Sequence, residues 1–271
     1  MKSPDLRQLA AQLALLDGPP RQSFERCFDP DEAVELRGLF AIEDCGEALA
    51  EIPAADFPRV GSHAYDSLGA PYGDASPFHL RQGVLSALYR AKDTLQQRRP
   101  GWQIEILDAY RPLAVQAFMV DYEFGRLARA QGFHPEQLGD AQAQPIWHQV
   151  FSIWAKPVDD PLMPPPHTTG AALDITLLDE HGAPVPMGSA IDAMGRVALP
   201  HCFANGTSPA DRGFHSNRQL LCEVMTAAGF QRHPFEWWHF SRGDQLWALM
   251  QWLDSEQVPL CPYGKAPIAA P

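Results

Sequence analysis

Proline most strongly limits what this chain can fold into. The sequence carries 26 prolines in 271 residues, and they cluster in a run at Pro161 and 164–166 and again after residue 258. Proline lacks a backbone N–H and fixes φ, so such runs exclude helix and favour extended, polyproline-like segments. We therefore expect an extended connection before residue 167 and an extended, proline-rich end of the chain.

The composition is that of a globular protein that can bury a full core, with 45% hydrophobic and 20% charged residues. Twenty-one Lys and Arg against 33 Asp and Glu give a net charge of −12, which opposes phosphate backbones and anionic membranes. We expect no nucleic-acid partner and no membrane partner. Five widely spaced cysteines without a CxxC pair, and an N-terminus whose apolar residues are interrupted by polar ones, indicate a reducing, cytoplasmic location.

Hydrophobic periodicity divides the chain into alternating helices and strands. It predicts helices over 6–16, 78–97, 114–131 and 217–229, and strands over 102–107, 171–178 and 236–240. The segment 61–73 is rich in Gly, Ser and Asp and is typical of a surface loop. Arg111 falls at the end of a strand, directly before a proline that starts a helix.

Three short segments contain side chains suited to metal-assisted hydrolysis. His167 precedes a glycine turn and Asp174 follows it on a strand, while Glu236 and His239 lie three residues apart in a short extended piece. Two imidazoles and one carboxylate would leave a zinc ion one open position, as catalytic sites do, and would lower the pKa of a bound water to about 7. Glu236 could then act as the base, and Arg111 could stabilise an oxyanion.

Each of these residues also has an ordinary structural interpretation. A single histidine is more often hydrogen-bonded in a core or on a surface than bound to a metal. Arg111 could form an ion pair with the nearby Asp108 instead of meeting a substrate. Only the joint pattern favours the metal site.

That joint pattern resembles a known family. His-x2-Gly-x-Ala-x-Asp, followed by Glu-Trp-Trp-His and preceded by Asp-x-Tyr-Arg-Pro, is similar to the D-alanyl-D-alanine dipeptidases, zinc enzymes of the vancomycin-resistance type related to D,D-carboxypeptidases. The resemblance runs from about Gly61 to about Leu249. It implies an α+β fold, with a central, mainly antiparallel sheet, helices packed against it and a zinc site in a cleft on the sheet.

The resemblance also implies roles for individual residues. His167, Asp174 and His239 would bind one zinc ion per chain, Glu236 would be the general acid and base, and Arg111 would clamp the carbonyl or oxyanion. Asp192, four residues after Gly188, matches the aspartate that binds the free amine of the substrate, although it could instead cap a turn. A buried carboxylate that requires an ammonium partner would restrict the enzyme to dipeptides.

The function expected from this resemblance is zinc-dependent hydrolysis of a small dipeptide, D-Ala-D-Ala or a related D-amino-acid dipeptide. Two alternatives stay open: a D,D- or L,D-carboxypeptidase acting on cell-wall peptides, which Asp192 disfavours, and a non-catalytic zinc-containing peptide-binding module, which Glu236 disfavours. We divide the chain into an N-terminal extension at 1–58, a zinc dipeptidase domain at 59–258 and a proline-rich tail at 259–271. A homo-oligomer is compatible with the sequence.

Overall fold

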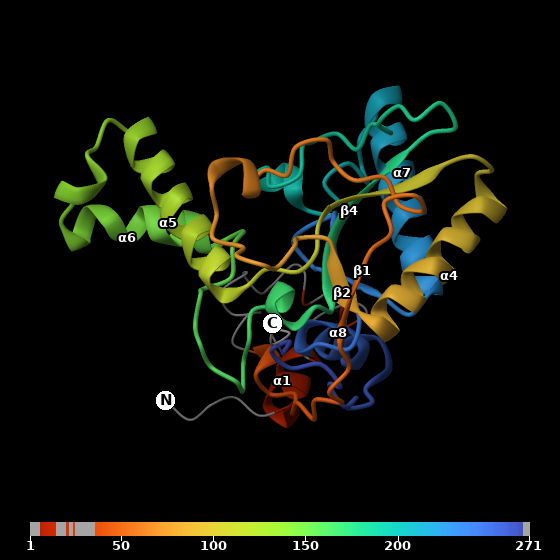
Figure 1. The fold of residues 1–271 in the computed structure, drawn as a ribbon, viewed down its shortest axis with the longest axis horizontal. Coiled ribbons are helices and arrows are strands. Elements are labelled where there is room, and N and C mark those ends of the chain that lie inside the picture. Colours follow the sequence, from red (N-terminus) through yellow and green to blue (C-terminus); the bar gives the residue numbers. More distant parts are fainter. Residues whose placement is uncertain (1–5, 15–19, 22–23, 25–35, 268–271) are drawn as a thin grey trace.

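The computed structural model describes residues 6–14, 20–21, 24 and 36–267. Figure 1 shows a central sheet with helices on its sides and a pair of helices that extends away from it. The helices are α1 (Leu6–Leu13), α4 (Gln82–Arg98), α5 (Leu113–Ala130), α6 (Asp140–Phe151), α7 (Pro209–Ala227) and α8 (Gln245–Ser255). The strands are β1 (Leu49–Glu51), β2 (His79–Arg81), β3 (Gln103–Asp108), β4 (Ala172–Leu178), β5 (Gln231–Arg232) and β6 (His239–Ser241).

The main sheet has four antiparallel strands in the order β3-β4-β6-β5, and β1 and β2 form a separate antiparallel pair. β4 lies between β3 and β6, and six of its seven residues are buried. This confirms the expected α+β fold with a mainly antiparallel sheet. The register also brings polar side chains together, because Asp174 on β4 is the pairing partner of both Asp108 on β3 and His239 on β6.

The largest apolar core joins the sheet to α4 and α7, which pack against each other beside it (Figure 1). α4 contributes Val84, Leu88 and Leu95 from one face, as the periodicity of its sequence predicted. β3 and β4 contribute alternate residues such as Ile106 and Ile175. Full burial of one such aliphatic side chain contributes about 1.5–3 kcal/mol, so this layer holds the central strands in place.

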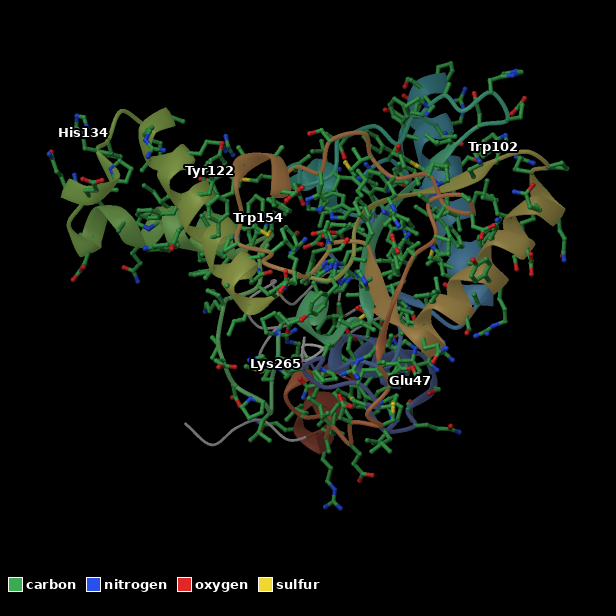
Figure 2. The ribbon with its side chains drawn as sticks, viewed as in Figure 1. Glu47, Trp102, Tyr122, His134, Trp154 and Lys265 are labelled. Carbon is green, nitrogen blue, oxygen red and sulfur yellow. The ribbon has the colours of Figure 1, made fainter. Side chains whose placement is uncertain are left out.

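α5 and α6 form an arm that extends from the rest of the molecule (Figure 1). Figure 2 shows Tyr122 and His134 on this arm, and Trp154 where the arm joins the body. A second apolar cluster lies along the arm and includes Val115, Met119 and Trp154. After α6 the chain returns to the body, where Nε1 of Trp154 donates to the hydroxyl of Tyr65 at 3.2 Å.

Both segments that flank the central part of the chain pack against it. Ile42 forms an isolated parallel bridge with Cys261, and β1 adds to β2. The fully buried Arg81 holds the three parts together: its guanidinium donates to the carbonyls of Thr169 and Gly264, at 2.8 and 3.1 Å, and to the carboxylate of Asp44 at 2.8 Å.

Several sequence expectations need correction. The helix expected from residue 78 begins only at Gln82, because the preceding residues pair with β1 as strand β2. The helix expected from residue 217 begins at Pro209, where Ser208 caps it by accepting from Asp211 N. Helices α6 and α8 were not expected. The segment 61–73 is more than a surface loop, since His63 and Tyr65 are buried within it.

None of the helices in the described part of the chain is long and apolar enough to cross a membrane. The predicted helix over 6–16 is present as α1, although its last two residues lie outside the described ranges, as do residues 268–271 of the proline-rich end.

Candidate active site

His167, Asp174 and His239 are brought together by a short turn and by strand pairing. His167 lies in a 3-10 turn, Pro166–Thr169, that ends at Gly170 with φ +69°, a left-handed conformation that favours glycine. This turn leads directly into β4, where Asp174 faces His239 on β6. The positions of all three side chains are therefore fixed by backbone structure.

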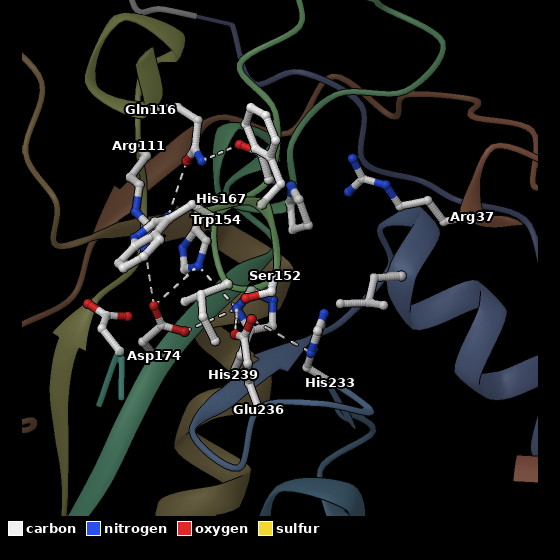
Figure 3. A pocket seen from close by; sticks show the side chains of 16 residues that line it. Arg37, Arg111, Gln116, Ser152, Trp154, His167, Asp174, His233, Glu236 and His239 are labelled. Atoms are coloured by element: carbon white, nitrogen blue, oxygen red, sulfur yellow. Dashed lines mark hydrogen bonds and ion pairs between the residues drawn. The ribbon is translucent and has the colours of Figure 1, made fainter. Parts of the chain in front are cut away.

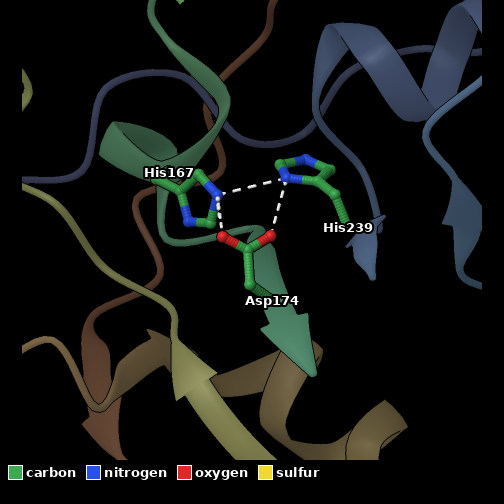
Figure 4. A group of neighbouring side chains, drawn as sticks. All are labelled: His167, Asp174 and His239. Atoms are coloured by element: carbon green, nitrogen blue, oxygen red, sulfur yellow. Dashed lines mark hydrogen bonds and ion pairs between the residues drawn. The ribbon is translucent and has the colours of Figure 1, made fainter. Parts of the chain in front are cut away.

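The three side chains converge on one point (Figure 4). Nε2 of His167 lies 3.2 Å from Nδ1 of His239, which lies 3.0 Å from Oδ1 of Asp174, and His167 Nε2 lies 3.4 Å from Asp174 Oδ2. A tetrahedral zinc ion with bonds of about 2.0–2.1 Å separates its ligand atoms by about 3.3 Å. The spacing of the three groups therefore matches what a metal ion requires.

The outer hydrogen bonds of these side chains favour the same conclusion. Nδ1 of His167 donates to the carbonyl of Ala109 at 2.6 Å, so its Nε2 carries the free lone pair that faces the other two side chains. The far nitrogen of His239, Nε2, lies 3.4 Å from the hydroxyl of Ser241. The described residues contain one such group of His, Asp, Glu or Cys side chains, and it contains no cysteine.

Glu236 lies beside this group without joining it. Its Oε2 lies 3.8 Å from Nδ1 of His239 and its Oε1 lies 3.8 Å from Nδ1 of His233. Burial, followed by the negative charges of Asp174 and Asp192, holds the pKa of the Glu236 carboxyl well above its usual range. A buried carboxyl of this kind, close to a candidate metal ion, is suited to proton transfer.

Arg111 is held in one orientation by three side chains. It donates from Nε to Asp108, from Nη2 to Asp174 at 3.1 Å and from Nη1 to Gln116 at 3.2 Å. Asp108 also contacts Nε2 of His63 at 3.1 Å. The ion pair with Asp108 is therefore confirmed, and it fixes the guanidinium at the pocket wall rather than removing it from the pocket.

Asp192 lies in the same pocket, in the left-handed region at φ +58°. The hydroxyl of Tyr65 donates to its Oδ2 at 2.6 Å, and Nε1 of Trp154 donates to the Tyr65 oxygen at 3.2 Å. Burial, together with the charge of Asp174, raises the pKa of Asp192 to about 6. No hydrogen bond of the described residues makes this carboxylate a turn cap.

Comparison with known proteins agrees with the geometry. The family model described as D-ala-D-ala dipeptidase, of the M15 peptidases, matches residues 59–257. The chain belongs to this family. It is accordingly a peptidase, and the expected resemblance is confirmed.

Two curated relatives of the family are both D-alanyl-D-alanine dipeptidases. The one from Synechocystis is 47% identical over 213 residues, which cover 76% of this chain and 86% of the relative. The one from Escherichia coli is 31% identical over 161 residues, covering 59% of this chain and 65% of the relative. A solved structure of a mutant vancomycin-resistance D,D-pentapeptidase, VanY, in complex with Zn(II) aligns with a TM-score of 0.41 and 15% identity, over 83% of this chain and 96% of that one.

In this member of the family, one pocket brings together all six residues singled out in the sequence (Figure 3). Its lining comprises Arg37, Arg111, Gln116, Phe151, Ser152, Ile153, Trp154, Ala155, Pro166, His167, Asp174, Asp192, His233, Glu236, His239 and Leu246. Sequence patterns did not identify Arg37 or Gln116 as pocket residues, nor Tyr65 as the partner of Asp192. His233 was noted only for its closeness in the sequence, and its pKa lies well below the usual range because of burial and the neighbouring His239.

Proposed function

We propose that this protein is a zinc-dependent dipeptidase and that D-Ala-D-Ala is the first substrate to test. The observation that carries the proposal is that one pocket brings together three side chains that could hold a metal ion, a separate glutamate and a separate aspartate. The curated relatives, named as D-alanyl-D-alanine dipeptidases, support the choice of substrate.

His167, Asp174 and His239 would hold the zinc ion. When bound, zinc acts as a Lewis acid that polarises a carbonyl and lowers the pKa of water. Arg111 orients the Asp174 carboxylate through its 3.1 Å bond to Oδ2. Its guanidinium, fixed by Asp108 and Gln116, would also stabilise negative charge on the carbonyl oxygen as the peptide bond is attacked.

Glu236 would move the proton. It lies close to the ligand group but offers no ligand atom to it, so its carboxylate is available to take a proton from the attacking water and return it to the departing amine. A raised pKa keeps both protonation states accessible during the cycle.

Asp192 would bind the ammonium group of the substrate. The carboxylate is buried, and Tyr65 holds it in place with one hydrogen bond to Oδ2. A peptide extended at its amino end would bury an unpaired carboxylate here, which costs free energy. The arrangement therefore favours dipeptides over longer chains.

The proposal is tested with Glu236→Gln, assayed by amine release from D-Ala-D-Ala with added zinc and with a chelator. We expect the variant to keep one zinc ion per chain and to lose at least about 100-fold in kcat, the lower range for a positioned general base. Wild-type protein should lose activity in chelator. Zinc-loaded wild-type protein that hydrolyses no D,D-, L,D- or L,L-dipeptide, or that hydrolyses a pentapeptide faster than its terminal dipeptide, would contradict the proposal.

A further inference from the structure

Arg37 adds a buried positive charge to the pocket from a part of the chain outside the family match. Its side chain lines the pocket, and only 4% of the residue's surface is exposed. Its neighbours Leu36 and Phe40 are buried against α8, and the carbonyl of Arg37 accepts a hydrogen bond from Phe40 N at 3.1 Å. The backbone that carries Arg37 is therefore anchored.

The guanidinium of Arg37 lacks a partner among the described residues. Its Nε forms no hydrogen bond, and no described carboxylate forms an ion pair with it. The negative charge of Asp244 partly offsets the effect of burial on the Arg37 pKa, but no hydrogen bond or ion pair joins these two described side chains. Oδ1 of Asp244 caps α8 by accepting from Trp247 N at 2.8 Å. Burial lowers the pKa of Arg37 to about 10, so the group remains charged at neutral pH.

A buried, unpaired cation lowers the stability of a protein, and one that points into a pocket indicates an anionic ligand. The planar guanidinium can meet a carboxylate with two parallel hydrogen bonds. Pro166, which also lines the pocket, has no backbone N–H and so cannot supply such a donor.

The position of Arg37 in the pocket indicates which end of a bound ligand it would contact. Figure 3 shows Arg37 on the opposite side of the His167 and His239 side chains from Arg111. Asp192 belongs to the Arg111 side, since its partner Tyr65 has its ring centroid 5.4 Å from the Arg111 guanidinium carbon. The pocket thus has a carboxylate at one end, the metal group in the middle and an unpaired guanidinium at the other end.

We propose that Arg37 binds the α-carboxylate of the substrate and so requires a dipeptide with a free carboxyl end. The inference rests on the proposed function, in which Asp192 takes the ammonium group. A zwitterionic dipeptide then spans the pocket with its peptide bond beside the ligand group and Glu236. Substrates with an amidated or extended carboxyl end leave Arg37 unpaired and bind poorly.

The test compares D-Ala-D-Ala with its C-terminal amide in wild-type protein and in Arg37→Met, a substitution that keeps much of the length and volume. Wild-type protein should prefer the free acid by about 10- to 100-fold in kcat/KM, the range for a charge-assisted hydrogen bond, and the variant should lose that preference. Most of the loss should appear in KM, because the α-carboxylate is not the reacting group.

A matched control is Arg21→Met. Arg21 belongs to the same N-terminal region but pairs with Asp254 at 2.8 Å and does not line the pocket, so the preference for the free acid should be unchanged. Thermal unfolding gives a second readout. Since the Arg37 guanidinium makes no described hydrogen bond, Arg37→Met should keep or raise the midpoint, whereas a purely structural ion-pair role would lower it.

The outcomes separate the two proposals. Equal kcat/KM for the acid and the amide in wild-type protein, or an equal fall for both in Arg37→Met, overturns the role of Arg37 even if the dipeptidase activity is present. If wild-type protein hydrolyses neither compound, the proposed function fails and binding decides. A larger thermal stabilisation by D-Ala-D-Ala than by its amide, lost in Arg37→Met, then supports the carboxylate site, and equal stabilisation refutes it.

Discussion

Replacing Asp108 by alanine tests how much the network behind the pocket contributes to stability. Asp108 is 4% exposed and accepts from Nε of Arg111 and from Nε2 of His63. Asp108→Ala leaves both buried donors without this acceptor, and breaking a buried ion pair in this way costs about 3–5 kcal/mol. With an unfolding entropy of about 2.1 cal/mol/K per residue, a chain of 271 residues should lose about 5–9 °C in its thermal midpoint.

The assay is thermal unfolding in chelator at pH 7, so that loss of a metal ion cannot explain the shift. Asp159→Ala is the control, because Asp159 pairs with Lys265 at 2.6 Å but its side chain is 68% exposed, and an exposed pair contributes at most about 1 kcal/mol. Equal shifts in the two variants would refute the reasoning.

The stability that Asp108 contributes should fall as the solution becomes more acidic. Burial alone would raise the pKa of Asp108, but Arg111 and the neighbouring histidines lower it below its usual 3.8. The native state therefore binds fewer protons than the unfolded state, and the stabilisation is present above 3.8 and lost as the pH falls through the depressed pKa. The difference between wild-type protein and Asp108→Ala should shrink in acid.

Three further predictions concern the pocket and its turn. Asp192→Asn should raise the thermal unfolding midpoint in chelator more at pH 7 than at pH 4. The pKa of Asp192 is raised to about 6, so its ionisation destabilises the native state increasingly as the pH rises above the usual 3.8. An equal effect of the substitution at the two pH values would contradict this. Zinc should raise the thermal unfolding midpoint of wild-type protein, measured by calorimetry, but not that of His167→Ala, because a metal ion stabilises the native state only when it is bound there. An equal rise in both proteins would remove His167 from the ligand set. Gly170→Ala should destabilise more than Gly132→Ala in urea unfolding. Both glycines have positive φ, which costs alanine about 1–2 kcal/mol. A Cβ at Gly170 would in addition lie 2.4 Å from the Leu49 side chain, whereas one at Gly132 meets nothing within 4 Å. Equal losses of unfolding free energy in the two variants would exclude the steric contribution.

Short-range patterns were sufficient to predict that His167, Asp174 and His239 lie close together. His167 and Asp174 lie seven positions apart across one glycine turn, and Glu236 and His239 lie three apart, so local spacing already places each pair. The antiparallel register of β4 and β6 then joins the two pairs. The motif therefore contained most of the information about how these side chains converge.

The rest of the pocket depends on contacts between distant segments. Tyr65 reaches Asp192 across 127 positions, and nothing in the glycine-rich sequence around it indicates burial. Arg37 comes from a segment without any motif. Helix α6 was obscured by Pro145 in its interior, while Asp244 before α8 was a capping signal that could have been recognised.

The hydrogen bonds from Arg81 to both flanking segments limit how far the protein can be shortened. A truncated chain limited to residues 59–257 would keep every motif of the family but would lose Asp44 and Gly264, two of the acceptors around this buried guanidinium. It would also expose the apolar surface of α8 that Phe40 and Cys261 cover. For expression or crystallisation, the unit to retain therefore extends from before Phe40 to beyond Gly264, well past the limits that sequence similarity marks.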